Sequence, residues 1–117
     1  MQAEELLWAI LPEGLEEEFE IESYRKEEQR FVIVLVEKNR VPRNLPLKYR
    51  GKRIINNVLS PLTMNDFSLR GRKTELVLKR RYWQFEGIKE MYCQPFDFCA
   101  PGTKLSQELA AFLKAND

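Results

Sequence analysis

The sequence contains no histidine and only two cysteines. Histidine is the commonest general base and the commonest zinc ligand, so its absence removes Ser-His and Cys-His nucleophile pairs and argues against an enzyme. Cys93 and Cys99 are too few for a disulfide framework, and five residues separate them, a longer gap than zinc knuckles use. We therefore expect no catalytic residue, no metal site and no cofactor, with both thiols reduced and structural.

The sequence also lacks a long apolar run and a basic N-terminal segment. No stretch approaches the ~20 apolar residues that cross a bilayer. The short apolar segment near the N-terminus lies beside Glu4 and Glu5 instead of the bases that begin a signal peptide. We expect a cytoplasmic protein that makes no membrane contact.

The 117 residues, 44% hydrophobic and 32% charged, suffice for one domain with its own core. The formal net charge of +1 hides an uneven distribution. Residues 1–29 hold ten acidic and two basic side chains, a net charge of −8, and residues 30–117 hold eight acidic and seventeen basic ones, a net charge of +9. We expect a single domain, 1–117, made of an acidic helix and first strand (1–29) and a basic sheet region with a C-terminal helix (30–117).

The first third of the chain predicts a helix and two strands. Apolar residues at helical spacing indicate a helix over 4–10, which Pro12 and Gly14 end, and the sequence LEEEF at 15–19 adds a helical turn. Residues 19–24 and 30–36 are rich in β-formers and flank a polar connection, so they predict a pair of strands.

The rest of the chain predicts a basic loop, strands and a final helix. Residues 37–53 carry seven bases and two prolines, which predicts an exposed loop that supplies no core residue. Residues 54–62 predict one or two short extended segments, interrupted by asparagines and Pro61. A turn around Gly71 leads into a long strand over 74–85, and a turn at 86–87 leads into a returning strand over 89–93. The C-terminal helix has Thr103 as its cap and Leu105, Leu109, Phe112 and Leu113 as its apolar residues.

Two basic blocks, residues 38–53 and 70–81, carry the functional hypothesis, because clustered Lys and Arg side chains neutralise phosphates. Alternation along the strand 74–85 puts Lys79 and Arg81 on the face opposite Leu76 and Leu78, so that face is predicted to meet DNA. Arg80 falls on the Leu76 face and is predicted to pass the core or to pair with an acid. The candidate DNA-binding residues are Arg70, Arg72, Lys73, Lys79, Arg81, Lys48, Arg50, Lys52 and Arg53.

The basic blocks and the aromatic residues beside them each have a simpler explanation than DNA binding. The basic side chains could pair with the acidic first third of the chain, folded back against them. The aromatic residues Tyr82, Trp83 and Phe85 could stack on bases, but their alternation with aliphatic residues favours packing in the core.

The stretch MNDFSLRGRKTELVLKRRYW, followed by PGTKLSQELAAFLK, resembles the N-terminal region of a family of bacterial insertion-sequence transposases. In a branch of that family this region is a separate small protein, and LPEGLEEEFEI at 11–21 extends the likeness to about two thirds of the chain. The family's zinc ribbon carries an Asp, an Arg-Gly-Arg-Lys turn, an apolar strand and a paired Arg-Arg-aromatic. The matching residues here are Asp66, Arg70, Gly71, Arg72, Lys73, Leu76, Leu78, Lys79, Arg80, Arg81 and Tyr82.

The cysteine pairs of that ribbon are missing, since none precedes Asp66 and WQFEGIKEMYC follows Tyr82. The resemblance therefore implies an α+β fold: a small antiparallel sheet like a metal-free zinc ribbon, flanked by N- and C-terminal helices. Aromatic packing would replace the metal. The residues expected to provide it are Trp83, Phe85, Tyr92 and Phe96.

In the family this region recognises terminal inverted repeats, and a separate domain with an acidic triad cuts and joins DNA. The resemblance implies a non-catalytic DNA-binding component whose partner is a catalytic transposase protein encoded downstream. The alternative is a protein-interaction module, in which the acidic first third and the LLWAIL helix dock that catalytic subunit without direct DNA contact. A stripe of Leu6, Leu7 and Ile10 would favour such docking or a homodimer.

Overall fold

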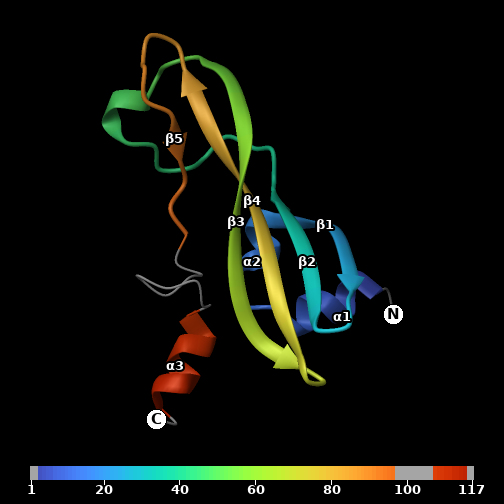
Figure 1. Ribbon diagram of the computed structural model, residues 1–117. Coiled ribbons are helices and arrows are strands. Elements are labelled where there is room, and N and C mark those ends of the chain that lie inside the picture. The colour runs from blue at the N-terminus through green and yellow to red at the C-terminus, as the bar shows by residue number, and fades with distance from the viewer. Residues whose placement is uncertain (1–2, 97–106, 116–117) are drawn as a thin grey trace.

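The computed structural model describes residues 3–96 and 107–115 as an α+β fold with a mixed, five-stranded sheet (Figure 1). The strands are β1 (Phe19–Lys26), β2 (Arg30–Glu37), β3 (Ile54–Leu69), β4 (Arg72–Phe85) and β5 (Tyr92–Cys93). The helices are α1 (Ala3–Ile10), α2 (Leu15–Glu18), the 3-10 turn η1 (Leu47–Tyr49) and α3 (Gln107–Ala115). The α+β prediction, the first helix, the LEEEF turn and the first two strands are confirmed.

The prediction of an antiparallel sheet is wrong. The strand order is β1-β2-β4-β3, with β5 beside β4, and β2 pairs with β4 in parallel. A parallel pair needs a long crossover. The loop after β2 and the whole of β3 provide it: the chain travels to the far end of the sheet, returns along β3 and enters β4 in the direction of β2.

The hairpin of β3 and β4 is the longest feature of the molecule, whose largest dimension is 49 Å. Its two-residue turn, Arg70-Gly71, has φ angles of 52° and 78°, the left-handed pair that a type I′ turn requires. The predicted turn is confirmed, but the short segments predicted over 54–62 are wrong, because β3 runs unbroken for 16 residues. Pro61 is tolerated there because β3 is an edge strand, where a proline without an N–H removes no necessary ladder bond.

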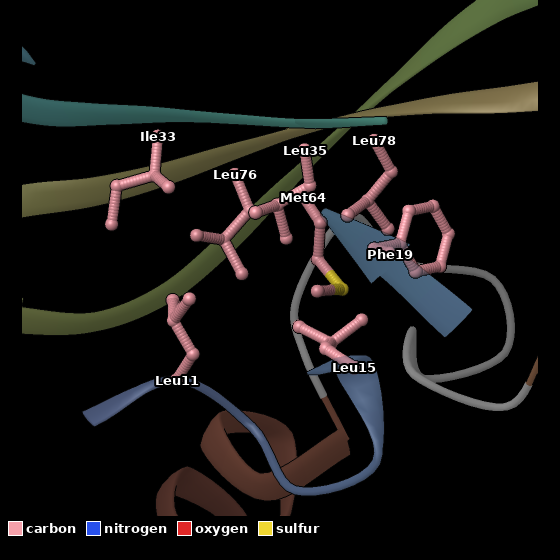
Figure 2. Close-up of a cluster of buried hydrophobic side chains, with 8 residues drawn as sticks. All are labelled: Leu11, Leu15, Phe19, Ile33, Leu35, Met64, Leu76 and Leu78. Carbon is pink, nitrogen blue, oxygen red and sulfur yellow. The ribbon is translucent and has the colours of Figure 1, made fainter. Parts of the chain in front are cut away.

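One face of the sheet holds the main hydrophobic core (Figure 2). Leu76 and Leu78 of β4, both at most 3% exposed, lie on this face as predicted. Leu11, which directly follows α1, and Leu15 of α2 pack against them. Ile33, Leu35, Met64 and Phe19 complete the cluster.

A second core lies at the far end of β4, on its opposite face. Trp83 and Phe85 are buried there against Tyr49, whose ring centroid lies 5.0 Å from that of Phe85. Core packing of Trp83 and Phe85 is therefore confirmed, while Tyr82 is only partly buried. The expectation that residues 37–53 supply no core residue is wrong: η1 turns Tyr49 inward to 4% exposure, and its hydroxyl donates to the carbonyl of Glu90 at 3.3 Å.

The C-terminal part agrees with the sequence where it is described. β5 is shorter than the strand predicted over 89–93. Helix α3 carries Leu109, Phe112 and Leu113, and the Phe112 ring meets that of Phe67 on β3 at 5.4 Å between centroids. The proposed cap Thr103, with Leu105 and Cys99, lies outside the described residues. Within 3–96 and 107–115, no helix has the length and apolar character needed to cross a membrane.

Candidate nucleic-acid interface

The face of the sheet opposite the main core is covered by η1 only at its far end, where Trp83 and Phe85 lie. In Figure 1, α1 and α2 lie behind the sheet and α3 lies beside β3, so no described helix lies in front of β2 and the rest of β4, which we call the uncovered face. Strand alternation and the pairing of Val34 with Val77 put Val77, Lys79 and Arg81 on this face, opposite the core. The predicted alternation of β4, with Leu76 and Leu78 on the core face and Val77 and Lys79 on the other face, is therefore confirmed.

A cluster of bases lies at one end of this face. Because β2 and β4 are parallel, the β1–β2 turn and the β3–β4 turn lie side by side, and the Lys73 N–H donates to the carbonyl of Gln29 at 3.1 Å. We call the bases in these two turns and at the strand ends next to them the basic turn cluster. Its members are Arg25, Lys26, Arg30, Arg70, Arg72 and Lys73.

Three members of this cluster were not among the predicted residues. Arg25 and Lys26 stand at the end of the acidic segment 1–29, whose strongly negative sum conceals them, and Arg30 directly follows that segment. The sequence shows only that these bases flank a predicted hairpin connection. A basic turn of this kind suggests an anion-binding site only when a second basic turn lies next to it in the fold.

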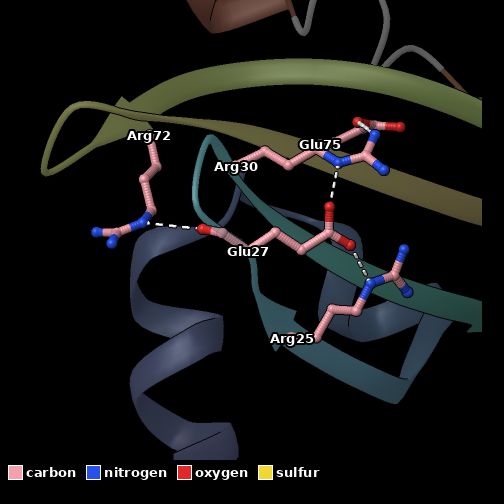
Figure 3. Close-up of polar contacts among 5 residues, drawn as sticks. All are labelled: Arg25, Glu27, Arg30, Arg72 and Glu75. Atoms are coloured by element: carbon pink, nitrogen blue, oxygen red, sulfur yellow. Dashed lines mark hydrogen bonds and ion pairs between the residues drawn. The ribbon is translucent and has the colours of Figure 1, made fainter.

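Glu27 organises the arginines of the cluster (Figure 3). Its carboxylate accepts hydrogen bonds from the Nε atoms of Arg25 and Arg30, the latter at 2.6 Å, and its carbonyl accepts from the Nε of Arg72 at 3.0 Å. Arg30 also pairs with Glu75 at 2.6 Å. These hydrogen bonds lower the pKa of Glu27 and raise that of Arg30. The carboxylate of Glu27 thus orients two guanidinium groups and its backbone carbonyl orients a third.

Three cations of the cluster are available to an anion. Arg70, Lys73 and Lys26 are exposed, and none of these side chains has an ion pair or hydrogen bond with any described residue. The left-handed conformation of Arg70 places it at the tip of the hairpin. Arg70 and Lys73 are thus the predicted DNA-binding residues of the cluster that lack a partner among the described residues.

The other predicted bases of β4 already have partners. Lys79 Nζ lies 2.6 Å from the Glu22 carboxylate, and the Arg72 guanidinium lies over the Phe31 ring, 5.8 Å from its centroid. Arg81 donates from Nε to the Glu37 carbonyl at 2.9 Å and from Nη1 to Asn57 Oδ1 at 2.7 Å. The Arg81 side chain therefore links β2 to β3, a structural role that sequence reasoning missed.

Arg80, on the opposite face, passes the core as predicted. Its Nη2 donates to the carbonyl of Gln94 at 3.0 Å, and its guanidinium lies 5.8 Å from the centroid of the Phe96 ring.

The second basic block lies at the other end of the hairpin. Arg53 precedes β3 and Arg70 follows it, and a strand of 16 residues spans on the order of 50 Å. Lys48 pairs with Glu90 at 2.6 Å, which raises the pKa of Lys48 and lowers that of Glu90, and Arg53 pairs with Glu86 at 3.1 Å. Arg50 donates to the carbonyl of Leu45 at 2.8 Å. Lys52 is exposed. The two blocks do not form a single groove.

The described residues contain no group of three or more Cys, Asp or Glu side chains placed to hold a metal ion. Cys93 is partly buried, and burial raises the pKa of its thiol, as in an unreactive structural cysteine.

No protein-family model matches the chain, and no curated protein or solved structure matches it. The likeness to transposases rests on the motif residues alone. In the structure, Arg70 and Gly71 of that motif form the hairpin turn, and Leu76 and Leu78 fill the core.

Proposed function

We propose that the protein is a non-catalytic, cytoplasmic DNA-binding component of an insertion-sequence transposase, and that it recognises terminal inverted repeats. The observation that carries this proposal is the basic turn cluster, six bases on two adjacent turns beside an uncovered sheet face. The motif that resembles the transposase family contributes three of them: Arg70, Arg72 and Lys73. The sheet then acts as a metal-free counterpart of the family's zinc ribbon.

The chemistry of this cluster suits phosphates. Arg70 and Lys73 make the first contacts because no described acid competes for them, and each phosphate that they neutralise releases a counterion. Arg25 and Arg30, fixed by Glu27, present their remaining N–H donors without having to be ordered on binding. The catalytic transposase encoded downstream is the proposed protein partner, and a homodimer would place two clusters on one DNA.

Binding of a fluorescently labelled duplex, followed by anisotropy at several salt concentrations, tests the proposal. We choose R70N because Asn-Gly suits a type I′ turn and should preserve the fold, and we combine it with K73Q. Each lost phosphate contact should weaken binding about fivefold and reduce the salt slope by ~0.9. The matched control is K89Q, which removes an exposed base outside the cluster. Equal affinity and equal slope for all three proteins would refute DNA binding by this cluster.

A second candidate is the protein-interaction module without DNA contact. Ion pairs between the basic region and the acidic first third favour it, namely Lys79 with Glu22 at 2.6 Å and Arg40 with Glu18 at 3.3 Å. Such ion pairs are what the simpler explanation predicts, in which the basic side chains pair with the acidic first third of the chain. On this account the wild-type protein leaves duplex DNA unbound even at low salt, so the same titration separates the two functions.

A further inference from the structure

An apolar cavity of about 190 Å³ opens beside the basic turn cluster, on the side of the sheet that carries the core. Leu7 and Ile10 of α1 form one wall, and Tyr24 and Phe31 of the β1–β2 hairpin form the other. Tyr24 pairs with the core residue Ile33, which fixes the side of the sheet on which the cavity lies. The cavity and the uncovered face are therefore on opposite sides.

The rim of the cavity is accessible. Ile10 and Tyr24 are each 51% exposed. Such a hollow leaves apolar surface in water, and a single large apolar side chain entering it would remove that surface from water.

The chemistry of the walls distinguishes between two kinds of ligand. The residues that line the cavity are aliphatic or aromatic, apart from Arg25 and Lys26. A nucleobase inserted there would find side-chain hydrogen-bonding partners only in Tyr24, Arg25 and Lys26, whereas an apolar side chain needs none. The cavity thus fits a side chain of a protein better than it fits a base.

The charges around the cavity indicate which residues should flank that side chain in the sequence of the partner. Both charged residues of the lining are basic. Arg25 already forms an ion pair with Glu27, whereas Lys26 has no ion pair with a described residue. Arg72 does not line the cavity, but its guanidinium lies over the ring of the wall residue Phe31. A segment with acidic residues next to its apolar anchor would match this surface.

We propose that this cavity is a docking site for an acidic segment of a partner protein, which inserts one large aliphatic or aromatic side chain between α1 and the β1–β2 hairpin. The apolar walls of the cavity lie on the core side of the sheet, and Arg70 and Lys73 do not line it. Arg25 and Lys26 belong to both surfaces, so the two ligands are separated by variants of Ile10 on one surface and of Arg70 and Lys73 on the other.

The probe is a labelled, end-blocked hexapeptide with a central Phe-Leu flanked by two Asp residues on each side, titrated with the full chain. Two companion peptides replace Phe-Leu by Ala-Ala or every Asp by Lys. We expect binding of the first peptide only. Equal binding of the three peptides, or no binding of the first at millimolar protein, would overturn the proposal.

The protein offers a matched pair of variants. Ile10 and Leu6 lie on the same helix with similar exposure, 51% and 54%, but only Ile10 lines the cavity. I10A should weaken peptide binding about fivefold, whereas L6A should leave it unchanged. K26E should weaken it as well, and K89E, which changes an exposed base elsewhere, should not. Equal losses from I10A and L6A would contradict the site, and unchanged circular dichroism would show that each variant is folded.

The DNA measurements keep this inference separate from the proposed function. I10A should bind duplex DNA as the wild type does, and the R70N/K73Q double variant should bind the peptide as the wild type does. If R70N/K73Q lost both ligands, the peptide would be acting only as a polyanion on the basic turn cluster, and the docking site would be refuted.

Discussion

The carboxylate of Glu37 accepts the backbone N–H of Arg81 at 2.8 Å, and the Nε of Arg81 donates in return to the carbonyl of Glu37 at 2.9 Å. β2 pairs with β4 only as far as Lys79, and β5 begins to pair with it at Tyr82. Glu37 thus fills the gap between two strands that share one edge of β4. A side chain replaces the ladder bond that neither strand provides.

Replacement of Glu37 by alanine should lower the free energy of unfolding by about 1–3 kcal/mol, because the Arg81 N–H would lose its partner in a buried setting. Glu37 is 3% exposed, so little water can take its place. E37Q keeps an acceptor and should be at least as stable as the wild type at pH 7. Urea unfolding of the three proteins measures this, and equal loss in E37A and E37Q would contradict it.

The same residue makes a prediction about pH. Burial raises the pKa of Glu37 above its ordinary value of 4.5, although the Arg81 N–H opposes the shift. The folded state therefore favours the protonated carboxyl, and this contribution to stability is present below pH 4.5 and lost as the pH rises through the folded-state pKa. Relative to E37Q, the wild type should lose stability between pH 4 and pH 7. A constant difference between the two would show that Glu37 does not titrate in this way.

Arg81, which the sequence predicts to contact DNA, should also matter for stability. R81A removes the side-chain bonds to Glu37 and Asn57, and we expect a loss of about 1–3 kcal/mol. R81K should recover only part of it, because a lysine cannot reproduce the fork of the guanidinium. The control is K79A, which removes a more exposed ion pair with Glu22 that is worth roughly 0–1 kcal/mol. Equal unfolding midpoints for R81A and K79A would refute the structural role.

Sequence reasoning located the parts of the fold that depend on neighbouring residues. The alternation of Leu76 and Leu78 identified the core face, and the Arg70-Gly71 pair identified the hairpin turn, because both are local signals. The continuity of β3 through Pro61 was missed, since a proline breaks a central strand but not an edge strand, and edge position is a property of the whole sheet. The parallel pairing of β2 with β4 was missed for the same reason.

The candidate site shows the same division. Arg70 and Lys73 were found because one short basic turn contains both. Arg25 and Arg30 were missed because they join that turn only through the parallel pairing of two distant strands. Tyr49 is buried because it packs against Trp83 and Phe85 at the far end of β4. No periodic pattern in the basic loop predicts this contact.

Gly71 offers a test of the hairpin turn. Its φ is 78°, and a Cβ there would meet nothing within 4 Å, so the cost of G71A comes from the backbone alone. We expect a loss of about 1–2 kcal/mol, the penalty for an L-residue in the left-handed region. G71N, with a residue that tolerates this conformation, is the control and should lose less. Thermal unfolding that ranks G71N below G71A would contradict the assignment of the turn.

Glu27 gives a pH dependence of opposite sign to that of Glu37. Hydrogen bonds from Arg25 and then Arg30 lower its pKa below 4.5, so its contribution to stability is present above pH 4.5 and lost as the pH falls through the folded-state pKa. E27Q should therefore have a lower Tm than the wild type at pH 7, and the two should converge on acidification. E28Q, at the neighbouring exposed position, is the control. A gap that stayed constant down to pH 2 would show that the arginines do not depend on the Glu27 charge.

The most direct test of the central claim is to locate the DNA on the protein by 15N–1H NMR, adding unlabelled duplex at low salt. The account predicts amide shifts over residues 25–30 and 70–73 and along the uncovered face near Val77. Signals of α1 and of residues 48–53 should stay in place. Shifts concentrated on α1 or on residues 48–53, or no shift at any DNA concentration, would contradict DNA binding by the basic turn cluster.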